Sequence, residues 1–94
     1  MAGVRAGVDE TDRELAALIG RRFRYMNAAA RIKPLREHVR DEGRKAQVIA
    51  NVAQQAVVNG WPPEVATELW EMLVEASIVY ELAAFDRLRT SDAA

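Results

Sequence analysis

Two basic residues, Arg22 and Lys33, are spaced so that both could bind one anion. They are eleven residues apart, which is three helical turns and only about 20° of rotation, so both side chains project from one face with Cα atoms roughly 16 Å apart. Met26 and either Ala29 or Ala30 lie between them and leave room for a small dianion. The same spacing would also suit two solvated bases at the edge of an amphipathic helix.

Five other positions carry groups that could join such a site. Ser77 and Glu81 share one helix face one turn apart, and an acid is unexpected within the apolar run SIVYELAAF. Asp41 and Arg44 stand where another helix is predicted to begin, and Arg5 lies near the N-terminus. Each has an ordinary structural explanation as well: a boundary acid paired with an arginine, a helix cap with a first-turn base, or a solvated terminal charge.

The positive charge of the chain is concentrated in one segment. Residues 21–45 hold nine Lys or Arg and three acids, whereas the formal net charge of the whole chain is −1. Concentrated charge in a nearly neutral protein favours a local site for a small anion. The acidic remainder and the lack of aromatic residues interleaved with the bases argue against nucleic-acid binding.

The composition is that of a folded protein, and we expect one domain over residues 1–94. Half of the residues are hydrophobic and 29% are charged. With no cysteine and a single histidine, we expect no disulfide and no metal site. No long apolar run is present and MAGVRAGVDE lacks the apolar core of a secretory signal, so we expect a cytoplasmic protein without a membrane span.

Hydrophobic periodicity predicts an all-α fold of three helices, over about 9–33, about 41–59 and from 62–63 to about 89. Pro34 ends the first helix, and Asn59-Gly60 ends the second. The predicted buried stripe of the first helix comprises Val8, Leu15, Leu18, Ile19, Met26, Ala29, Ala30 and Ile32. The predicted stripe of the third comprises Val65, Leu69, Met72, Leu73, Ala76, Tyr80 and Ala83.

The length of the first helix predicts a homodimer. A helix of 25 residues is a rod of roughly 37 Å, whereas a compact monomer of this size has a diameter of only about 32 Å. A helix longer than its own globule needs a second copy to cover its apolar face.

Taken together, the order and spacing of these residues resemble the all-helical chorismate mutases and the related isochorismate-pyruvate lyases. The resemblance covers about residues 4–88 and is carried by Arg5, Asp12, Glu14, Leu15, Arg22, Lys33, Asp41, Arg44, Ser77 and Glu81. It implies an intertwined homodimer with enclosed active sites, in agreement with the length of the first helix.

The resemblance also implies a role for each site residue. Lys33 and Glu81 look like the catalytic pair, with Lys33 contacting both a carboxylate and the ether oxygen of the substrate. The residues that look like substrate-binding groups are Arg5 (from the partner subunit), Arg22, Asp41, Arg44 and Ser77. The implied reaction is the rearrangement of chorismate to prephenate in aromatic amino acid biosynthesis.

That rearrangement is pericyclic and needs no nucleophile, metal or cofactor. Guanidinium groups would hold the dianion in its reactive conformer, and an ammonium would stabilise the charge that develops on the ether oxygen. Glutamate donates a hydrogen bond only when protonated, so burial and the substrate's charge must favour the neutral form of Glu81. We therefore expect activity to fall as pH becomes alkaline.

Two features leave alternatives open. Many mutases have an acid directly after the arginine of the second helix, where this chain has Lys45. That residue, the short 34–40 connection and the segment RRFRYMNAAARIK look lyase-like, whereas the Asp41–Arg44 pair looks mutase-like. A non-catalytic helical dimer or regulatory subunit is a further alternative. Arg36, His38 and Arg40 also suggest a mobile lid over the anion.

Overall fold

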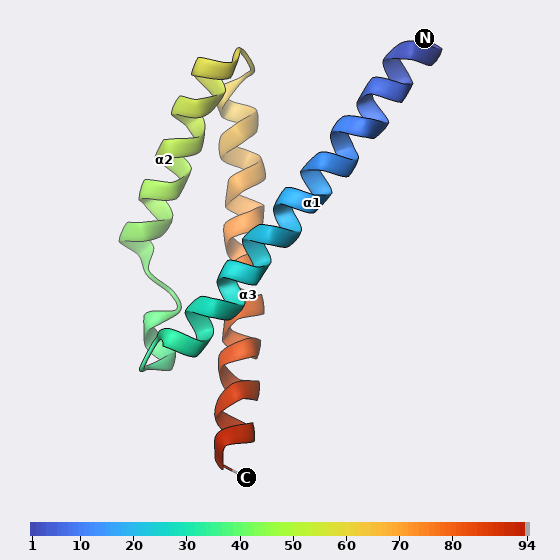
Figure 1. Cartoon of the computed structure of the whole chain (residues 1–94). Coiled ribbons are helices and arrows are strands. Elements are labelled where there is room, and N and C mark those ends of the chain that lie inside the picture. Colours follow the sequence, from blue (N-terminus) through green and yellow to red (C-terminus); the bar gives the residue numbers. More distant parts are fainter. Residues whose placement is uncertain (94) are drawn as a thin grey trace.

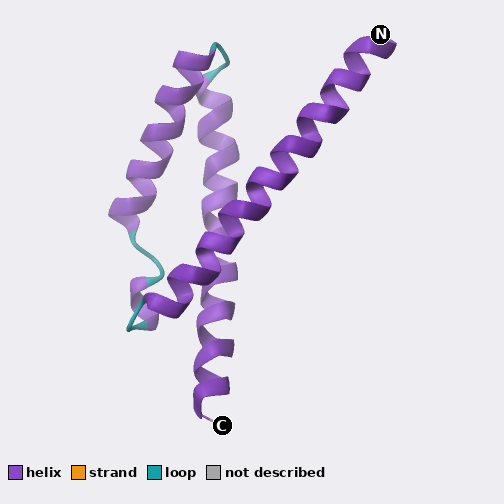
Figure 2. Ribbon diagram, viewed as in Figure 1, coloured by secondary structure: helices purple, strands orange, loops and turns teal. Residues whose placement is uncertain are grey.

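The computed structural model describes residues 1–93, with side-chain surroundings through residue 90. The described residues form helices joined by short loops and include no strand, which confirms the predicted all-α class (Figure 2). The elements are α1 (Ala2–Ile32), a single 3₁₀ turn η1 (Arg36–His38), α2 (Glu42–Asn59) and α3 (Pro63–Ala93).

Helix α1 begins at Ala2, so the prediction of a start near Asp9 was wrong. The prediction took the cluster of acids as the first turn, but the first turn holds no acid and the N-cap Met1 makes no side-chain bond. Gly3 and Gly7 lie inside the helix, at a cost of about 1 kcal/mol each relative to alanine. Extension of an existing helix gains one hydrogen bond per residue fixed, which offsets that cost.

The other helix ends follow local sequence signals. Lys33 is extended, with φ −63° and ψ 129°, because the following Pro34 disfavours helical geometry at the preceding residue. Asp41 caps α2 by accepting a hydrogen bond from the backbone N–H of Arg44 at 3.0 Å. Gly60 ends α2 in the left-handed region at φ 77°, where a glycine carries no Cβ penalty.

Helix α3 is the element on which the other two are assembled (Figure 1). It packs against α1, α2 and η1, whereas α1 and α2 do not contact each other in the described part of the chain. The N-terminal half of α1 extends from this assembly as an arm. The Cα radius of gyration is 16.4 Å and the longest extent 55 Å, against about 12 Å expected for the radius of a compact chain of this length.

Two small hydrophobic clusters hold the helices together. The first comprises Ala30, Val39, Val74, Ile78, Ala84 and Phe85 and joins α1, the loop after η1 and α3. The second comprises Val52, Ala56 and Ala66 and joins α2 to α3. Trp70 packs against both clusters, and Trp61 packs against the second.

The predicted buried stripe of α3 was wrong for a single chain. Val65, Leu69, Met72 and Tyr80 are 42%, 52%, 74% and 38% exposed. The face that packs internally instead holds Ala66, Val74, Ser77, Ile78, Glu81, Ala84 and Phe85. Because α3 is apolar on more than one face, periodicity alone could not show which face meets α1 and α2.

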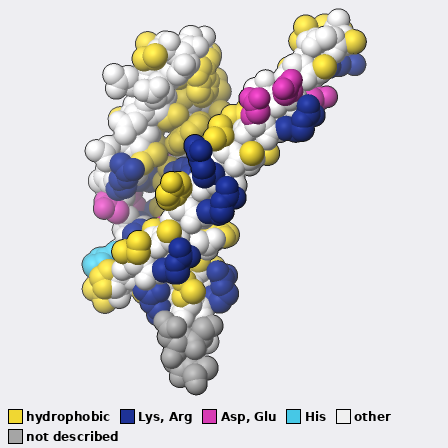
Figure 3. All heavy atoms as spheres, viewed as in Figure 1, with side chains coloured by type: hydrophobic (Ala, Val, Ile, Leu, Met, Phe, Trp, Pro, Cys, Tyr) yellow, Lys and Arg dark blue, Asp and Glu magenta, His cyan; other side chains and the backbone are white. Residues whose placement is uncertain are grey.

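The predicted apolar stripe of α1 is also largely exposed. Val8, Leu15, Leu18 and Ile19 on the arm are 52%, 50%, 49% and 39% exposed. Hydrophobic side chains are visible along the arm and over the neighbouring upper part of the α2–α3 pair (Figure 3). None of the helices in the described part of the chain combines the length and the apolar character needed to cross a membrane.

Candidate active site

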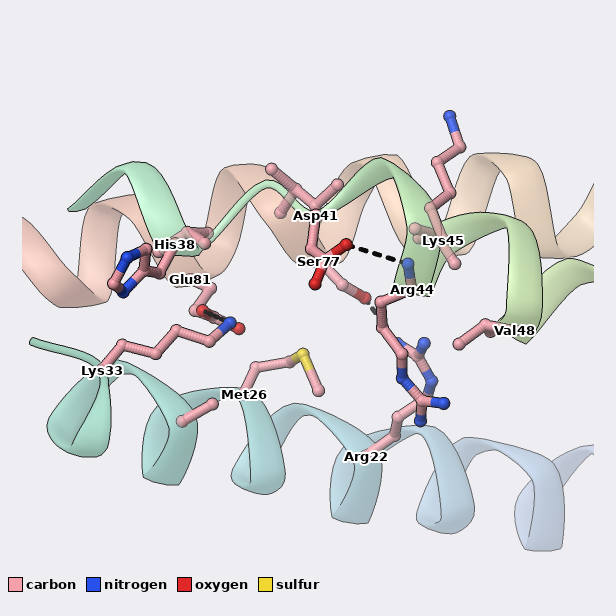
Figure 4. Close-up of a pocket in the computed structure, with 14 residues that line it drawn as sticks. Arg22, Met26, Lys33, His38, Asp41, Arg44, Lys45, Val48, Ser77 and Glu81 are labelled. Carbon is pink, nitrogen blue, oxygen red and sulfur yellow. Dashed lines mark hydrogen bonds and ion pairs between the residues drawn. The ribbon is translucent and has the colours of Figure 1, made fainter. Parts of the chain in front are cut away.

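A pocket of about 340 Å³ lies between α1 and α2, and α3 forms a further wall. This volume is in the range of small-molecule sites. Side chains from α1, the η1 loop, α2 and α3 line it (Figure 4). The lining residues include Arg22, Met26, Ala29, Lys33, Asp41, Arg44, Ser77 and Glu81. The structure thus brings together six of the seven predicted site residues, and it places Ala29 rather than Ala30 in the wall.

Lys33 and Glu81 face each other at one end of the pocket. Lys33 Nζ donates to Glu81 Oε2 at 2.6 Å, and the two side chains are 30% and 5% exposed. The sequence has an acid on an apolar face of the third helix, and in the structure Lys33 is its ion-pair partner. A charge-assisted bond of this length fixes both groups at the pocket wall.

Arg22 is held at the other end of the pocket by a neutral partner. Its Nη1 donates to Ser77 Oγ at 2.6 Å, and the same hydroxyl donates to the Leu73 carbonyl at 2.6 Å. Ser77 is 3% exposed, so water has little access to its hydroxyl. That hydroxyl accepts from Arg22 and donates to the Leu73 carbonyl. Burial, followed by the positive charge of Arg44, lowers the pKa of Arg22.

Arg44 lies opposite Arg22, and their guanidinium groups point toward one another (Figure 4). Asp41 fixes the backbone of Arg44 through the helix cap, and Arg44 Nη1 donates to Gln47 Oε1 at 2.6 Å. Neither arginine forms an ion pair with an acid in the described residues. Two neighbouring guanidinium groups with no carboxylate of the described residues paired to them can hold an anion.

The ammonium of Lys45 is directed away from the pocket (Figure 4). It donates to Glu71 at 2.7 Å and to Glu75 at 3.2 Å on α3, and these bonds raise the pKa of Lys45. The stem of Lys45 nevertheless lines the pocket. The described residues contain no group of three or more His, Asp or Glu that could hold a metal ion.

Arg5 is the predicted site residue that the single chain does not bring to the pocket. It is exposed on the arm of α1, and it lies 17 positions before Arg22 in the same continuous helix, about 25 Å along the axis. A contribution of Arg5 to a site must therefore involve a second chain.

The apolar and loop side of the pocket was missed by sequence reasoning. His38, interpreted as a solvated loop residue, lines the pocket, as do Val39, Val48 and Val74. Val48 could have been found, because it lies one turn after Arg44 on the same helix face. No sequence signal places His38, because the path of the loop depends on burial of Val39, which is 5% exposed.

The predicted lid, residues 36–40, is hydrogen-bonded to α3 on both sides of His38. Arg36 binds both carboxylate oxygens of Asp86 at 2.9 and 3.2 Å. Arg40 binds both carboxylate oxygens of Glu75 at 3.0 and 3.1 Å. Both arginines thus bind acids on α3 through paired hydrogen bonds, so their guanidinium groups are engaged on α3 instead of reaching over the pocket.

Comparison with known protein families gives a match over most of the chain. The family description chorismate mutase type II matches residues 4–82, which include every predicted site residue. A search of curated protein sequences found no match to the chain. With a family match over most of its length, the chain belongs to the chorismate mutase type II family.

Proposed function

We propose that this protein is a chorismate mutase that converts chorismate to prephenate. The observation that supports this best is the distribution of charge in the pocket. Two guanidinium groups that form no ion pair with any described acid lie at one end, and a lysine beside a buried glutamate lies at the other. This distribution matches a substrate with two carboxylates and an ether oxygen on which negative charge develops as its C–O bond breaks.

In this proposal Arg22 and Arg44 bind substrate carboxylates. Paired N–H donors of a guanidinium suit a carboxylate, and two such groups hold the dianion in the conformer that rearranges. Ser77 holds Arg22 in place before substrate enters, so less conformational entropy is lost on binding. Burial and, second, repulsion from Arg44 lower the pKa of Arg22, and a bound anion would relieve that repulsion.

Lys33 and Glu81 act on the ether oxygen. As the C–O bond breaks, negative charge develops on this oxygen, and an ammonium already held at the pocket wall stabilises it without reorganisation. Substrate enters between the two side chains and replaces their mutual bond. Glu81 then donates from the opposite side, which requires its protonated form.

The proposed enzyme is a homodimer in which the arms of α1 pair. The support is the elongated chain, with its radius of gyration of 16.4 Å, and the exposed apolar residues of α1 and α3. Isolated apolar side chains are normal on a surface, but contiguous apolar faces on two helices indicate an interface. Pairing would also carry Arg5 of the partner subunit toward the pocket.

Parallel incubation of the purified protein with chorismate and isochorismate tests the proposal. Loss of chorismate is followed by ultraviolet absorbance and formation of salicylate by fluorescence. We expect prephenate as the main product, with formation lost in Lys33→Ala and retained in Arg31→Ala, a control on the exposed side of the same turn. If neither chorismate nor isochorismate reacted, the catalytic assignment would fail and the fold would remain.

A second candidate is isochorismate-pyruvate lyase, and the orientation of Lys45 favours it. The position after Arg44 has no acid for a ring hydroxyl, and the ammonium of Lys45 is bound to Glu71 and Glu75 instead. Rapid salicylate release with slow chorismate turnover would select the lyase. In that case Lys45→Glu should raise turnover of chorismate relative to isochorismate.

A further inference from the structure

The end of α1 depends on a residue near the end of α3. Arg89 Nη1 donates to the carbonyl of Ala30 at 2.8 Å, and Arg89 Nη2 donates to the carbonyl of Lys33. Ala30 is fully buried. In a continuing helix its carbonyl would accept the N–H of residue 34, but residue 34 is proline and has none. Arg89 supplies the missing donor.

The guanidinium of Arg89 is itself fixed. Its central carbon lies 3.9 Å from the centre of the Phe85 ring, a cation–π contact. One turn earlier on α3, Asp86 binds Arg36 through two hydrogen bonds, which hold the pKa of Asp86 below its usual range. Asp86 and Arg89 therefore bind the chain on both sides of Pro34.

We propose that Arg89 is a positioning residue that fixes the backbone of Lys33 and thereby the place of its ammonium in the pocket. The inference rests on the proposed function. Arg89 lies outside the family match, which ends at residue 82, so this role is not part of what the match conveys.

The position of Lys33 makes such a support necessary. Lys33 is the first residue after α1, in extended geometry, so its backbone is not held on both sides by helical hydrogen bonds. Its own N–H is bound to the carbonyl of Ala29 at 2.9 Å, and Arg89 binds its carbonyl. Without the second bond the last turn can fray and the ammonium can move relative to Glu81. A misplacement of about 1 Å can cost about 100-fold in rate.

Kinetics of three variants test this role. We expect Arg89→Ala to lower kcat by about tenfold or more with a smaller change in KM, because substrate is still bound by Arg22 and Arg44. Arg89→Lys keeps the charge but cannot reproduce both bonds, so its kcat should be intermediate. Arg87→Ala is the control, because Arg87 is exposed and lies two positions before Arg89 in the sequence.

A second readout does not depend on the reaction. The chain has only two lysines, Lys33 and Lys45, and each ammonium is held in an ion pair, so nitrogen-15 NMR of the protein should give two ammonium signals. We expect Arg89→Ala and Arg89→Lys to shift or broaden the Lys33 signal and leave that of Lys45 unchanged. Assignment follows from a Lys33→Met variant.

The two readouts separate the inference from the proposed function. If neither chorismate nor isochorismate reacts but the Lys33 signal moves, the proposed function fails and the positioning of Lys33 stands. An unchanged Lys33 signal with wild-type kcat in folded Arg89→Lys would overturn the positioning role, even if Arg89→Ala does not fold. Equal effects of Arg87→Ala and Arg89→Ala on kcat would also overturn it.

Discussion

The ammonium of Lys33 and the carboxylate of Glu81 lie 2.6 Å apart at one end of the pocket and join the end of α1 to the middle of α3. The Glu81 side chain is only 5% exposed. The two groups proposed to act on the ether oxygen are therefore hydrogen-bonded to each other. Substrate must replace this bond, and the protonation of Glu81 decides what it can donate afterwards.

The first prediction concerns pH. If Glu81 donates to the ether oxygen, kcat/KM should fall as pH rises, because the ionised carboxylate cannot donate. Glu81→Gln should flatten this dependence, since an amide donates at every pH. The measurement is a pH profile of kcat/KM for both proteins. A flat profile for the wild type, or the same profile in both, would remove Glu81 from this role.

The second prediction concerns the support of Arg22. Ser77→Ala removes the acceptor that holds the guanidinium, so we expect KM for chorismate to rise about tenfold, equivalent to one lost hydrogen bond to a charged group, with a smaller change in kcat. Steady-state kinetics measure both constants. Thr67→Ala, which removes an exposed hydroxyl bonded within α3, should leave them unchanged. An unaltered KM in Ser77→Ala would show that Arg22 is positioned without the serine.

The third prediction concerns acid stability. Hydrogen bonds from Arg40 and Lys45 lower the pKa of Glu75 to about 2, from an ordinary value of 4.5. A lowered native-state pKa adds stability that is complete above the ordinary value and disappears as pH falls toward about 2. The difference in Tm between wild type and Glu75→Gln should therefore be largest at neutral pH and vanish near the low value.

Thermal unfolding followed by circular dichroism over that pH range measures the difference. Glu68→Gln, an exposed position on the same helix, serves as control and should not show this pattern. A Tm difference that stays constant from neutral to acid pH would mean that the charge of Glu75 does not stabilise the fold.

The fourth prediction concerns assembly. Leu18 is 49% exposed on the arm of α1, so Leu18→Asp should convert a dimer to a monomer by placing a charge in the apolar interface. Ala17→Asp, about 100° around the helix from Leu18 and outside the apolar stripe, should remain a dimer. Sedimentation or light scattering gives the mass of each. A wild-type monomer at micromolar concentration would contradict the proposed pairing of arms.

The sequence was sufficient for the fold class and for the helix ends with strong chemical signals. Pro34, the Asp41 cap and Gly60 each act through their own backbone or side chain, so local reasoning located them. It failed at the start of α1, where no capping side chain marks the boundary. It also failed for the buried face of α3, since two apolar faces of one helix have the same periodicity.

The core of the candidate site was predictable because each of its three pairs lies within a single helix or includes the residue that caps it. Spacing alone placed Arg22 with Lys33 and Ser77 with Glu81, and the cap placed Asp41 with Arg44. What could not be predicted is which pairs meet: the bonds from Arg22 to Ser77 and from Lys33 to Glu81 span 55 and 48 residues. The roles of His38 and Arg89 depend on the packing of the loop against α3, which has no local sequence signal.

The most direct test of the anion site is the comparison of Arg22→Ala with Arg21→Ala. The two arginines are neighbours of equal charge, but only Arg22 lines the pocket with Ser77 and Glu81, whereas Arg21 is exposed on another side of α1. We expect kcat/KM for chorismate to fall about 100-fold or more in Arg22→Ala and to stay near the wild-type value in Arg21→Ala. Equal values of kcat/KM in the two variants would contradict this expectation.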